Sequence, residues 1–217
     1  MLNRLFLRSA ASGSLILGLL TITAFAKSNA PAPVSPTEML ANRFSSMGPI
    51  SLAGISIGNF GVVDGRIFRG EQPSGKDYAA LAGIGVKTII DLREDAKSSA
   101  RRDAESAGFK YINIQIDGHG RPTDEQANEF LNAVDDPGNG ILYVHCAGGR
   151  HRTGSMIAIY RMTHDEWTID QAYNEMLAYD FYTSGGHEGF KSYVYDFSRH
   201  LNLAPKLAIA SVASASK

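Results

Sequence analysis

Short runs of β-branched and apolar residues alternate with helical segments along most of this chain, and that alternation limits the folds it can adopt. Residues 86–93 (VKTIIDLR), 110–116 (KYINIQI) and 141–145 (ILYVH) have the length and composition of buried strands. The stretch 60–70 is typical of a hairpin, with its turn at Asp64 and Gly65. We therefore predict a single α/β domain with a central, mostly parallel sheet flanked by helices.

Polar caps and glycines mark the expected helix boundaries. Residues 123–126 form a capping box that starts a helix reaching about residue 134, and residues 168–171 start another that ends near 179. Further helices are expected at 76–85, 99–108, 153–164 and 187–201. Their alternation with the strands is the pattern that an α/β sheet requires.

Size and charge limit the class of protein. A chain of 217 residues, 44% of them hydrophobic, can bury one substantial core but hardly two. The formal net charge of −1 excludes a protein that holds nucleic acid by bulk charge. A local phosphate site remains compatible with this balance.

The first 26 residues have the pattern of a secretory signal peptide. Arg4 and Arg8 precede an apolar run at 15–20, and an Ala-x-Ala cleavage signal lies at 24–26. We expect an exported protein, periplasmic or secreted, with no stable membrane association once the peptide is removed. The alternative is an uncleaved anchor, because residues 9–26 approach the minimum length that spans a bilayer.

Composition suggests the remaining boundaries. Residues 27–54 are rich in Pro, Ala and Ser, which is typical of a linker. The folded domain is expected at 55–200. The segment 201–217 is low in complexity and is predicted to be a flexible tail.

Cys146 is the sole cysteine of the sequence, so it has no partner for an internal disulfide. In an exported protein an exposed thiol is a liability, because the compartment is oxidising. Cys146 is therefore either buried and inert or retained for its chemistry.

The residues that follow Cys146 favour the second alternative. A loop between a buried strand and a helix directs backbone N–H groups toward one point, where the helix N-terminus adds positive potential. Gly148 and Gly149 permit the backbone angles that such a loop needs, and Arg152 supplies a bidentate fork for two anion oxygens. We expect a phosphate-sized anion site in which Cys146 is favoured as the thiolate.

These residues carry a resemblance to a known family. The stretch 145–154 (HCAGGRHRTG) resembles the H-C-x5-R-[ST]-G signature of the cysteine-dependent protein tyrosine and dual-specificity phosphatases. Its ending is most similar to the atypical, plant and fungal type branch and its bacterial relatives. Residues 67–73 (IFRGEQP) and 88–95 (TIIDLRED) resemble two further elements of that branch. The resemblance covers the domain at 55–200 and implies a dual-specificity phosphatase-like fold.

The resemblance also implies roles for the loop. Cys146 would attack phosphorus and form a cysteinyl-phosphate, while Arg152 and the loop amides hold the phosphate oxygens. No cofactor and no metal are needed. Thr153 is expected to donate a hydrogen bond to the sulfur, and His145 to support the loop by bonding its carbonyls. The predicted substrate-binding residues are Ala147, Gly148, Gly149, Arg150, His151 and Thr153.

The family also uses an aspartate upstream of the cysteine to protonate the leaving group. Asp117 follows the predicted strand 110–116 in a glycine-rich loop and is the preferred candidate. Asp124 is the competitor, but it lies in the first turn of a capped helix, where a carboxylate has a structural role. Arg93 and Glu94, which follow another strand at the same sheet edge, are expected to form a surface ion pair, with a substrate contact as the alternative.

Three functions remain open at this point. The first is an exported phosphatase acting on phosphotyrosine or other phosphoprotein substrates. The second is a phosphatase of the same mechanism acting on inositol phosphates or pyrophosphates, since the loop is basic. The third is a phosphatase-like module that binds phosphate groups without turnover. In each case the partner is a phosphorylated protein or a small phosphorylated molecule.

Overall fold

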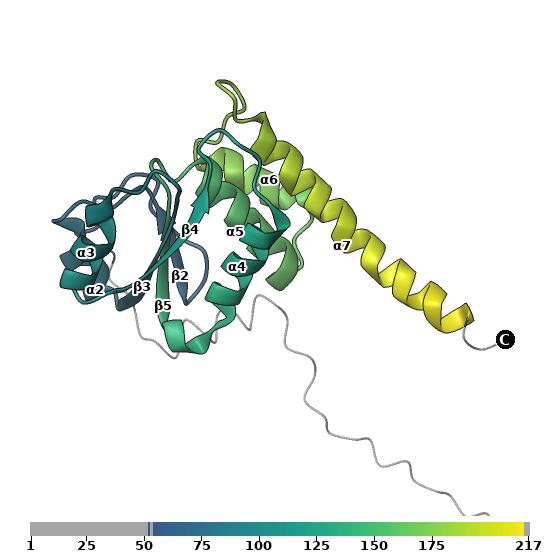
Figure 1. The fold of residues 1–217 in the computed structure, drawn as a ribbon, viewed down its shortest axis with the longest axis horizontal. Coiled ribbons are helices and arrows are strands. Elements are labelled where there is room, and N and C mark those ends of the chain that lie inside the picture. The colour runs from purple at the N-terminus through teal and green to yellow at the C-terminus, as the bar shows by residue number, and fades with distance from the viewer. Residues whose placement is uncertain (1–51, 53, 215–217) are drawn as a thin grey trace, which may run out of the picture. The chain divides into compact units, whose positions relative to one another are not determined.

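The computed structural model describes residues 52 and 54–214 (Figure 1). The predicted signal peptide and most of the predicted linker lie outside the described residues. Among the residues that the structure does describe, no helix combines the length and apolar character needed to cross a bilayer.

A five-stranded sheet forms the centre of the domain, in the order β1-β2-β5-β3-β4. Only the pair β1 and β2 is antiparallel, and it forms the predicted hairpin, while β2, β5, β3 and β4 run parallel. The prediction of a mostly parallel α/β sheet is therefore confirmed. The strands are β1 (Gly61–Val62), β2 (Ile67–Gly70), β3 (Val86–Arg93), β4 (Lys110–Ile116) and β5 (Ile141–His145).

Helices cover both faces of the sheet (Figure 1). One face carries α2 and α3, whose apolar side chains pack with β3 around Ile89 and Leu81. The other face carries the remaining helices around a second core that includes Ile157 and Phe130. The helices are α2 (Asp77–Gly83), α3 (Ser98–Ser106), α4 (Asp124–Asp135), α5 (His151–His164), α6 (Ile169–Ala178) and α7 (Glu188–Ser214), with a 3-10 turn at Pro137–Asn139.

Both predicted capping boxes are present. The hydroxyl of Thr123 accepts from the N–H of Gln126 at the start of α4, and Thr168 and Gln171 repeat the arrangement at α6. Helix α5 begins at His151, two residues before the predicted start, so Arg152 and Thr153 lie inside its first turn. Helix α7 continues to Ser214, into the segment for which we predict a tail.

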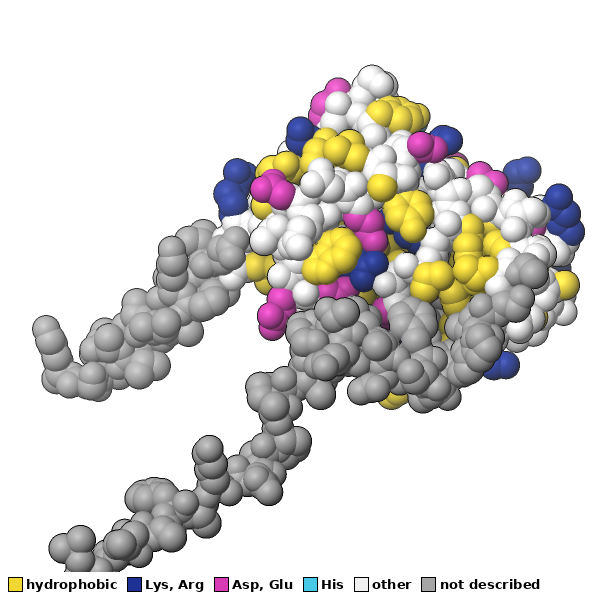
Figure 2. Space-filling view, turned by 180° about the vertical axis from the view of Figure 1, so that it is seen from behind, with side chains coloured by type: hydrophobic (Ala, Val, Ile, Leu, Met, Phe, Trp, Pro, Cys, Tyr) yellow, Lys and Arg dark blue, Asp and Glu magenta, His cyan; other side chains and the backbone are white. Residues whose placement is uncertain are grey.

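Charged side chains of both signs are interspersed with apolar ones on the face shown in Figure 2. This distribution agrees with the net charge of −1. The described part of this face therefore has no single-sign surface of the kind that nucleic acid binders present.

Candidate active site

Cys146 directly follows β5, the strand in the middle of the sheet. Since β3, β4 and β5 are parallel, the segments after all three strands meet at the same edge of the sheet. A cavity of about 440 Å³ lies there. It is lined by Glu94 and Asp95 after β3, by Asp117, Gly118 and His119 after β4, by Cys146, Ala147, Gly148, Arg150, His151 and Arg152, and by Tyr182 and His187.

The loop after β5, residues 146–150, is held from outside by its carbonyl groups. Four successive carbonyl oxygens, from Cys146 to Gly149, each accept a hydrogen bond from a residue beyond the loop. The donors are His145 Nδ1 to Cys146 (3.0 Å), the Gln72 N–H to Ala147 (3.1 Å), Asn59 Nδ2 to Gly148 (2.8 Å) and Arg69 Nη2 to Gly149 (2.9 Å).

Outward carbonyls leave the loop N–H groups available to a ligand. Within the described part of the chain, the N–H groups of residues 147–150 have no acceptor. Successive unpaired N–H groups in such a turn form an anion-binding concavity, and the N-terminus of α5 adds positive potential beside it. This arrangement fits a phosphate group above Cys146, as we predict from the sequence.

Gly149 is needed for this loop on two grounds. Its φ of +67° lies in the left-handed region, which side chains other than glycine rarely adopt. A Cβ built there would also lie 2.5 Å from the carbonyl carbon of Gly70, at the end of β2. Any larger residue would therefore separate the loop from the strand that supplies part of its support.

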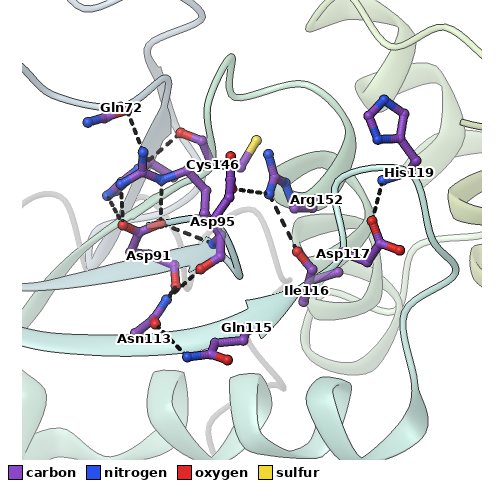
Figure 3. A network of polar contacts seen from close by, with 12 residues as sticks. Gln72, Asp91, Asp95, Asn113, Gln115, Ile116, Asp117, His119, Cys146 and Arg152 are labelled. Atoms are coloured by element: carbon purple, nitrogen blue, oxygen red, sulfur yellow. Dashed lines mark hydrogen bonds and ion pairs between the residues drawn. The ribbon is translucent and has the colours of Figure 1, made fainter. Parts of the chain in front are cut away.

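Cys146 lies at the floor of the cavity and is 3% exposed. The guanidinium of Arg152 lies close to it in Figure 3, where Nη1 donates to Asp95 Oδ1 (3.1 Å) and to the Ile116 carbonyl (3.4 Å). Asp95 therefore binds the same guanidinium that we predict to bind phosphate. The sequence motif 88–95 ends at Asp95, but nothing in the sequence indicates this contact.

His145 makes the predicted contact with a loop carbonyl, and its ring is fully buried. Burial lowers the pKa of His145, although Asp91, at 3.8 Å from Nε2, opposes the shift. The ring is consequently neutral at physiological pH. A neutral ring suits a support for the loop.

Arg93 corrects one prediction. We expect it in a surface ion pair with Glu94, but it is only 5% exposed, and its guanidinium donates two hydrogen bonds and its backbone N–H a third to the carboxylate of buried Asp91. Burial alone would raise the pKa of Asp91, yet hydrogen bonds from Arg93 and Tyr111 hold it below its ordinary value. Arg93 also binds Gln72, which in turn holds the Ala147 carbonyl.

The two candidate acids lie in different places. Asp117 lines the cavity, but its carboxylate accepts from the His119 N–H (2.8 Å) and points away from Cys146 (Figure 3). Asp124 is not among the residues that line the cavity, and it accepts from the hydroxyl of Tyr193 (3.0 Å). Of the two, only Asp117 borders the space in which a substrate would lie.

Thr153 corrects another prediction. Its hydroxyl oxygen is buried and has no hydrogen-bond partner among the described residues, so the expected bond to the Cys146 sulfur is absent. Thr153 lies fully buried within the first turn of α5. Of the predicted substrate-binding residues, Thr153 and Gly149 do not line the cavity, whereas Ala147, Gly148, Arg150 and His151 do.

Arg69 is a support that the sequence reasoning missed. It is 1% exposed, it lies behind the loop, and its Cζ lies 3.8 Å from the centre of the Tyr179 ring. Burial lowers the pKa of Arg69, and its Nε and Nη1 have no partner within the described residues. Arg69 and Gln72 both belong to the motif at 67–73, so the sequence could have indicated them as supports of the loop. No motif in the sequence indicates Asn59.

No group of three or more His, Cys, Asp or Glu residues in the described part of the chain is placed to hold a metal ion.

The middle strand of a mostly parallel sheet leads into an H-C-x5-R loop at the floor of a cavity. This combination defines a phosphatase of the protein tyrosine and dual-specificity superfamily. The family model described as "DSP-PTPase phosphatase fused to NAD+ Kinase" matches residues 60–188. The chain belongs to this family.

Two relatives illustrate the range of the family. The inositol diphosphatase DSP4 of Arabidopsis thaliana is 30% identical over 122 residues, which cover 54% of this chain and 61% of that protein. The probable tyrosine-protein phosphatase DG1060 of Dictyostelium discoideum is 28% identical over 122 residues, 54% of this chain and 73% of that protein. A mouse mRNA-capping enzyme matches over 17% of its own length, so this chain spans only part of several relatives.

Solved structures share the fold. The core catalytic domain of the PP-IP phosphatase SIW14 from S. cerevisiae, in complex with citrate, has a TM-score of 0.57 at 21% identity, over 69% of this chain and 93% of that one. TpbA from P. aeruginosa has a TM-score of 0.56 at 23% identity, over 65% and 85%. At these identities the likeness concerns the fold alone, and it confirms the dual-specificity phosphatase-like architecture.

Proposed function

We propose that this protein is an exported phosphatase that works through a cysteinyl-phosphate on Cys146. The observation that carries the proposal is the set of four outward-held carbonyls, which leaves the loop N–H groups free above the sulfur. Preorganised N–H donors around a reacting group stabilise the charge that develops in the transition state.

The first step transfers the phosphoryl group to sulfur. The thiolate of Cys146 attacks phosphorus, an S–P bond forms, and the bond from phosphorus to the leaving oxygen breaks. Arg152 and the loop N–H groups hold the three remaining oxygens, which requires Arg152 to exchange Asp95 for the substrate. Asp117 donates a proton to the leaving oxygen after its carboxyl turns toward the cavity.

The second step releases inorganic phosphate. Water attacks the phosphorus of the cysteinyl-phosphate, and Asp117 accepts the proton that the water loses. The S–P bond breaks and the thiolate is regenerated. His145 stays neutral throughout and maintains the loop through the Cys146 carbonyl.

For the substrate we put an inositol pyrophosphate first and a phosphotyrosine protein second. DSP4 is named an inositol diphosphatase and SIW14 a PP-IP phosphatase, which supports the first. DG1060 is named a probable tyrosine-protein phosphatase, which supports the second. Parallel turnover assays on a polyphosphorylated inositol and a phosphotyrosine peptide separate the two candidates.

Export rests on the pattern of residues 1–26. Expression of the full chain and of a form without these residues, followed by fractionation and mass measurement, tests it. We expect the full chain outside the cytoplasm with its N-terminus shortened. An unshortened chain in the membrane fraction would support the anchor instead.

Replacement of Cys146 by Ser tests the mechanism. We expect turnover of para-nitrophenyl phosphate to fall by at least about 10⁴-fold, because serine is not ionised at neutral pH. Acid quenching of the wild type with labelled substrate should trap phosphate on the protein, and the Cys146→Ser variant should trap none. Turnover retained in the variant would contradict the mechanism, and absence of turnover in the wild type would favour a binding module.

A further inference from the structure

Three imidazole rings lie against one another along one side of the cavity. The ring of His187 is stacked between the other two, with centroids 5.1 Å from His119 and 3.7 Å from His151 and interplanar angles of 12° and 18°. The three residues come from the segment after β4, the first turn of α5 and the segment before α7, and all three line the cavity. We call them the imidazole wall.

Hydrogen bonds determine which nitrogen atoms of the wall carry protons. His151 Nε2 lies 3.1 Å from the carbonyl oxygen of Tyr182, to which it donates, so Nδ1 of the neutral ring carries a lone pair. His187 bonds the backbone of Gly118, and its Nδ1 has no partner among the described residues. These Nδ1 atoms can donate to an anion only after the rings take up a proton.

The neutral state of His151 and His187 has clear causes. Burial and the neighbouring ring of His187 together lower the pKa of His151 to about 4. Burial and the ring of His119 also lower the pKa of His187. The charged groups around the wall are Arg150 and Arg152 from the loop and α5, Asp117 after β4, Asp180 beside Arg150, and Glu188 at the start of α7. Glu94 and Asp95, after β3, line the same cavity.

Groups that attract an anion lie on this side of the cavity, beside the carboxylates of Asp117 and Glu188. Helices α5 and α7 both begin at the wall, and the N-terminus of each favours an anion. The guanidinium of Arg150 lies over Gly148, 3.2 Å from the position of a Cβ there, and so covers the rim of the loop. A negatively charged group would therefore meet Arg150, two helix N-termini and rings that can become cationic.

The cavity also has room for more than the reacting group. Its volume of about 440 Å³ lies in the range of pockets for whole small molecules, which is about 300–1,000 Å³. The scissile phosphate occupies the floor at Cys146 and Arg152, according to the proposed function on which this inference rests. We infer that the imidazole wall with Arg150 is a subsite for a second phosphate group, which binds together with a proton taken from solvent.

The substrate class that follows is a compound with two phosphate groups close together, either a diphosphate or neighbouring monoesters. Its binding should strengthen as the pH falls toward 6, because the rings gain protons more readily beside the second phosphate. A neutral wall could instead stack on the ring of an aryl phosphate, and the experiment below separates the two.

Calorimetry on the full chain tests the inference without turnover. Imidodiphosphate, a non-hydrolysable diphosphate, and inorganic phosphate are titrated in two buffers of different protonation heat between pH 6 and 8. The variants His119→Phe and His187→Phe keep a stacked ring but cannot bind a proton. We expect each to lose about tenfold in affinity for imidodiphosphate, the low end for a hydrogen bond to a charged group, and to take up fewer protons.

His200→Phe is the matched control, since His200 is exposed on α7 and does not line the cavity. It should bind both ligands as the wild type does. Melting curves check folding, and His119→Phe is the safer variant because that ring is exposed.

Equal proton uptake in the wild type and both Phe variants would overturn the inference. So would an unchanged imidodiphosphate affinity accompanied by tighter binding of phenyl phosphate, which would identify an aryl-stacking wall. Turnover of para-nitrophenyl phosphate, measured separately, reports on the proposed function. If the wild type binds imidodiphosphate no more tightly than inorganic phosphate while turnover is intact, the subsite is rejected and the proposed function is not.

Discussion

Two segments face the same cavity and are held in different ways. In the loop 146–150 after β5, four carbonyls accept hydrogen bonds from other segments. The donors lie before β1, in β2, just after β2 and at the end of β5. In the segment 117–122 after β4, the carboxylate of Asp117 is bonded, among the described residues, only to the N–H of His119, two positions away. The proposed nucleophile is thus positioned when the sheet forms, whereas the proposed acid has to be delivered by a local movement.

Replacing the acid gives the largest effect expected from this comparison. Asp117→Asn should lower kcat by about 10²-fold on a phenyl phosphate ester, because the leaving oxygen loses its proton donor. KM should change little. Asp124→Asn is the control, since Asp124 lies outside the cavity lining, and kcat measured across pH 5 to 8 is the readout. Equal losses in the two variants would mean that the acid assignment is wrong.

Removing a support behind the loop should have a smaller effect. Arg69→Met deletes the donor to the Gly149 carbonyl and a cation near Cys146, so we expect kcat/KM to fall about tenfold. Thermal stability should change little, because the substitution also removes two buried donors without partners. Alkylation of Cys146 by iodoacetamide at pH 7 should become slower, because a cation near the sulfur is lost.

Arg66→Met serves as the control for that experiment. Arg66 also donates to backbone carbonyls, those of Gly140 and Asp136, but on the far side of β5 from the loop. Its activity and alkylation profile should match the wild type. A melting temperature that falls in step with activity in Arg69→Met would indicate a structural role only.

The contact between Asp95 and Arg152 provides a finer test. Asp95 is largely exposed, and exposed ion pairs contribute about 0–1 kcal/mol. Asp95→Asn should therefore lower the inhibition constant of inorganic phosphate up to about fivefold, because Arg152 no longer exchanges one anion for another. Weaker phosphate inhibition in this variant would instead mean that Asp95 positions Arg152 for the substrate.

The smallest effect concerns stability and pH. The pKa of His151 is about 4 in the folded chain, below the ordinary value near 6.5 of the unfolded one. The unfolded chain therefore binds more protons between these values, so this contribution to stability is complete above pH 6.5 and declines as the pH falls toward 4. The melting temperature of His151→Phe should fall less steeply than that of the wild type over this window. Melting temperatures that fall equally with pH in the variant and the wild type would contradict the lowered pKa of His151.

Local features of the chain were predictable because their partners lie within a few residues. Each capping box joins Thr to Gln three positions later, and the strands at 86–93, 110–116 and 141–145 follow from the spacing of apolar residues. The loop from Cys146 to Arg152 is likewise continuous in sequence. Its anion-binding chemistry could be inferred from residue types and spacing before any tertiary contact was known.

Other parts of the site depend on contacts between distant segments. The parallel pairing of β2 with β5 brings Arg69 behind Gly149, eighty positions along the chain. The position of β3 between β5 and β4 accompanies the burial of Arg93 beside Asp91, where a surface pair is expected.

The sequence by itself therefore indicated the anion-binding loop with Cys146 and Arg152 and the order of strands and helices, since each is encoded within one short segment. Only the tertiary structure decided what holds the loop carbonyls, which carboxylate binds Arg152, and how three histidines from separate segments stack on one wall. The physical reason is that hydrogen bonds and ring contacts act over a few ångströms. Sequence spacing predicts which residues lie that close together within one turn, but not which residues meet across a sheet.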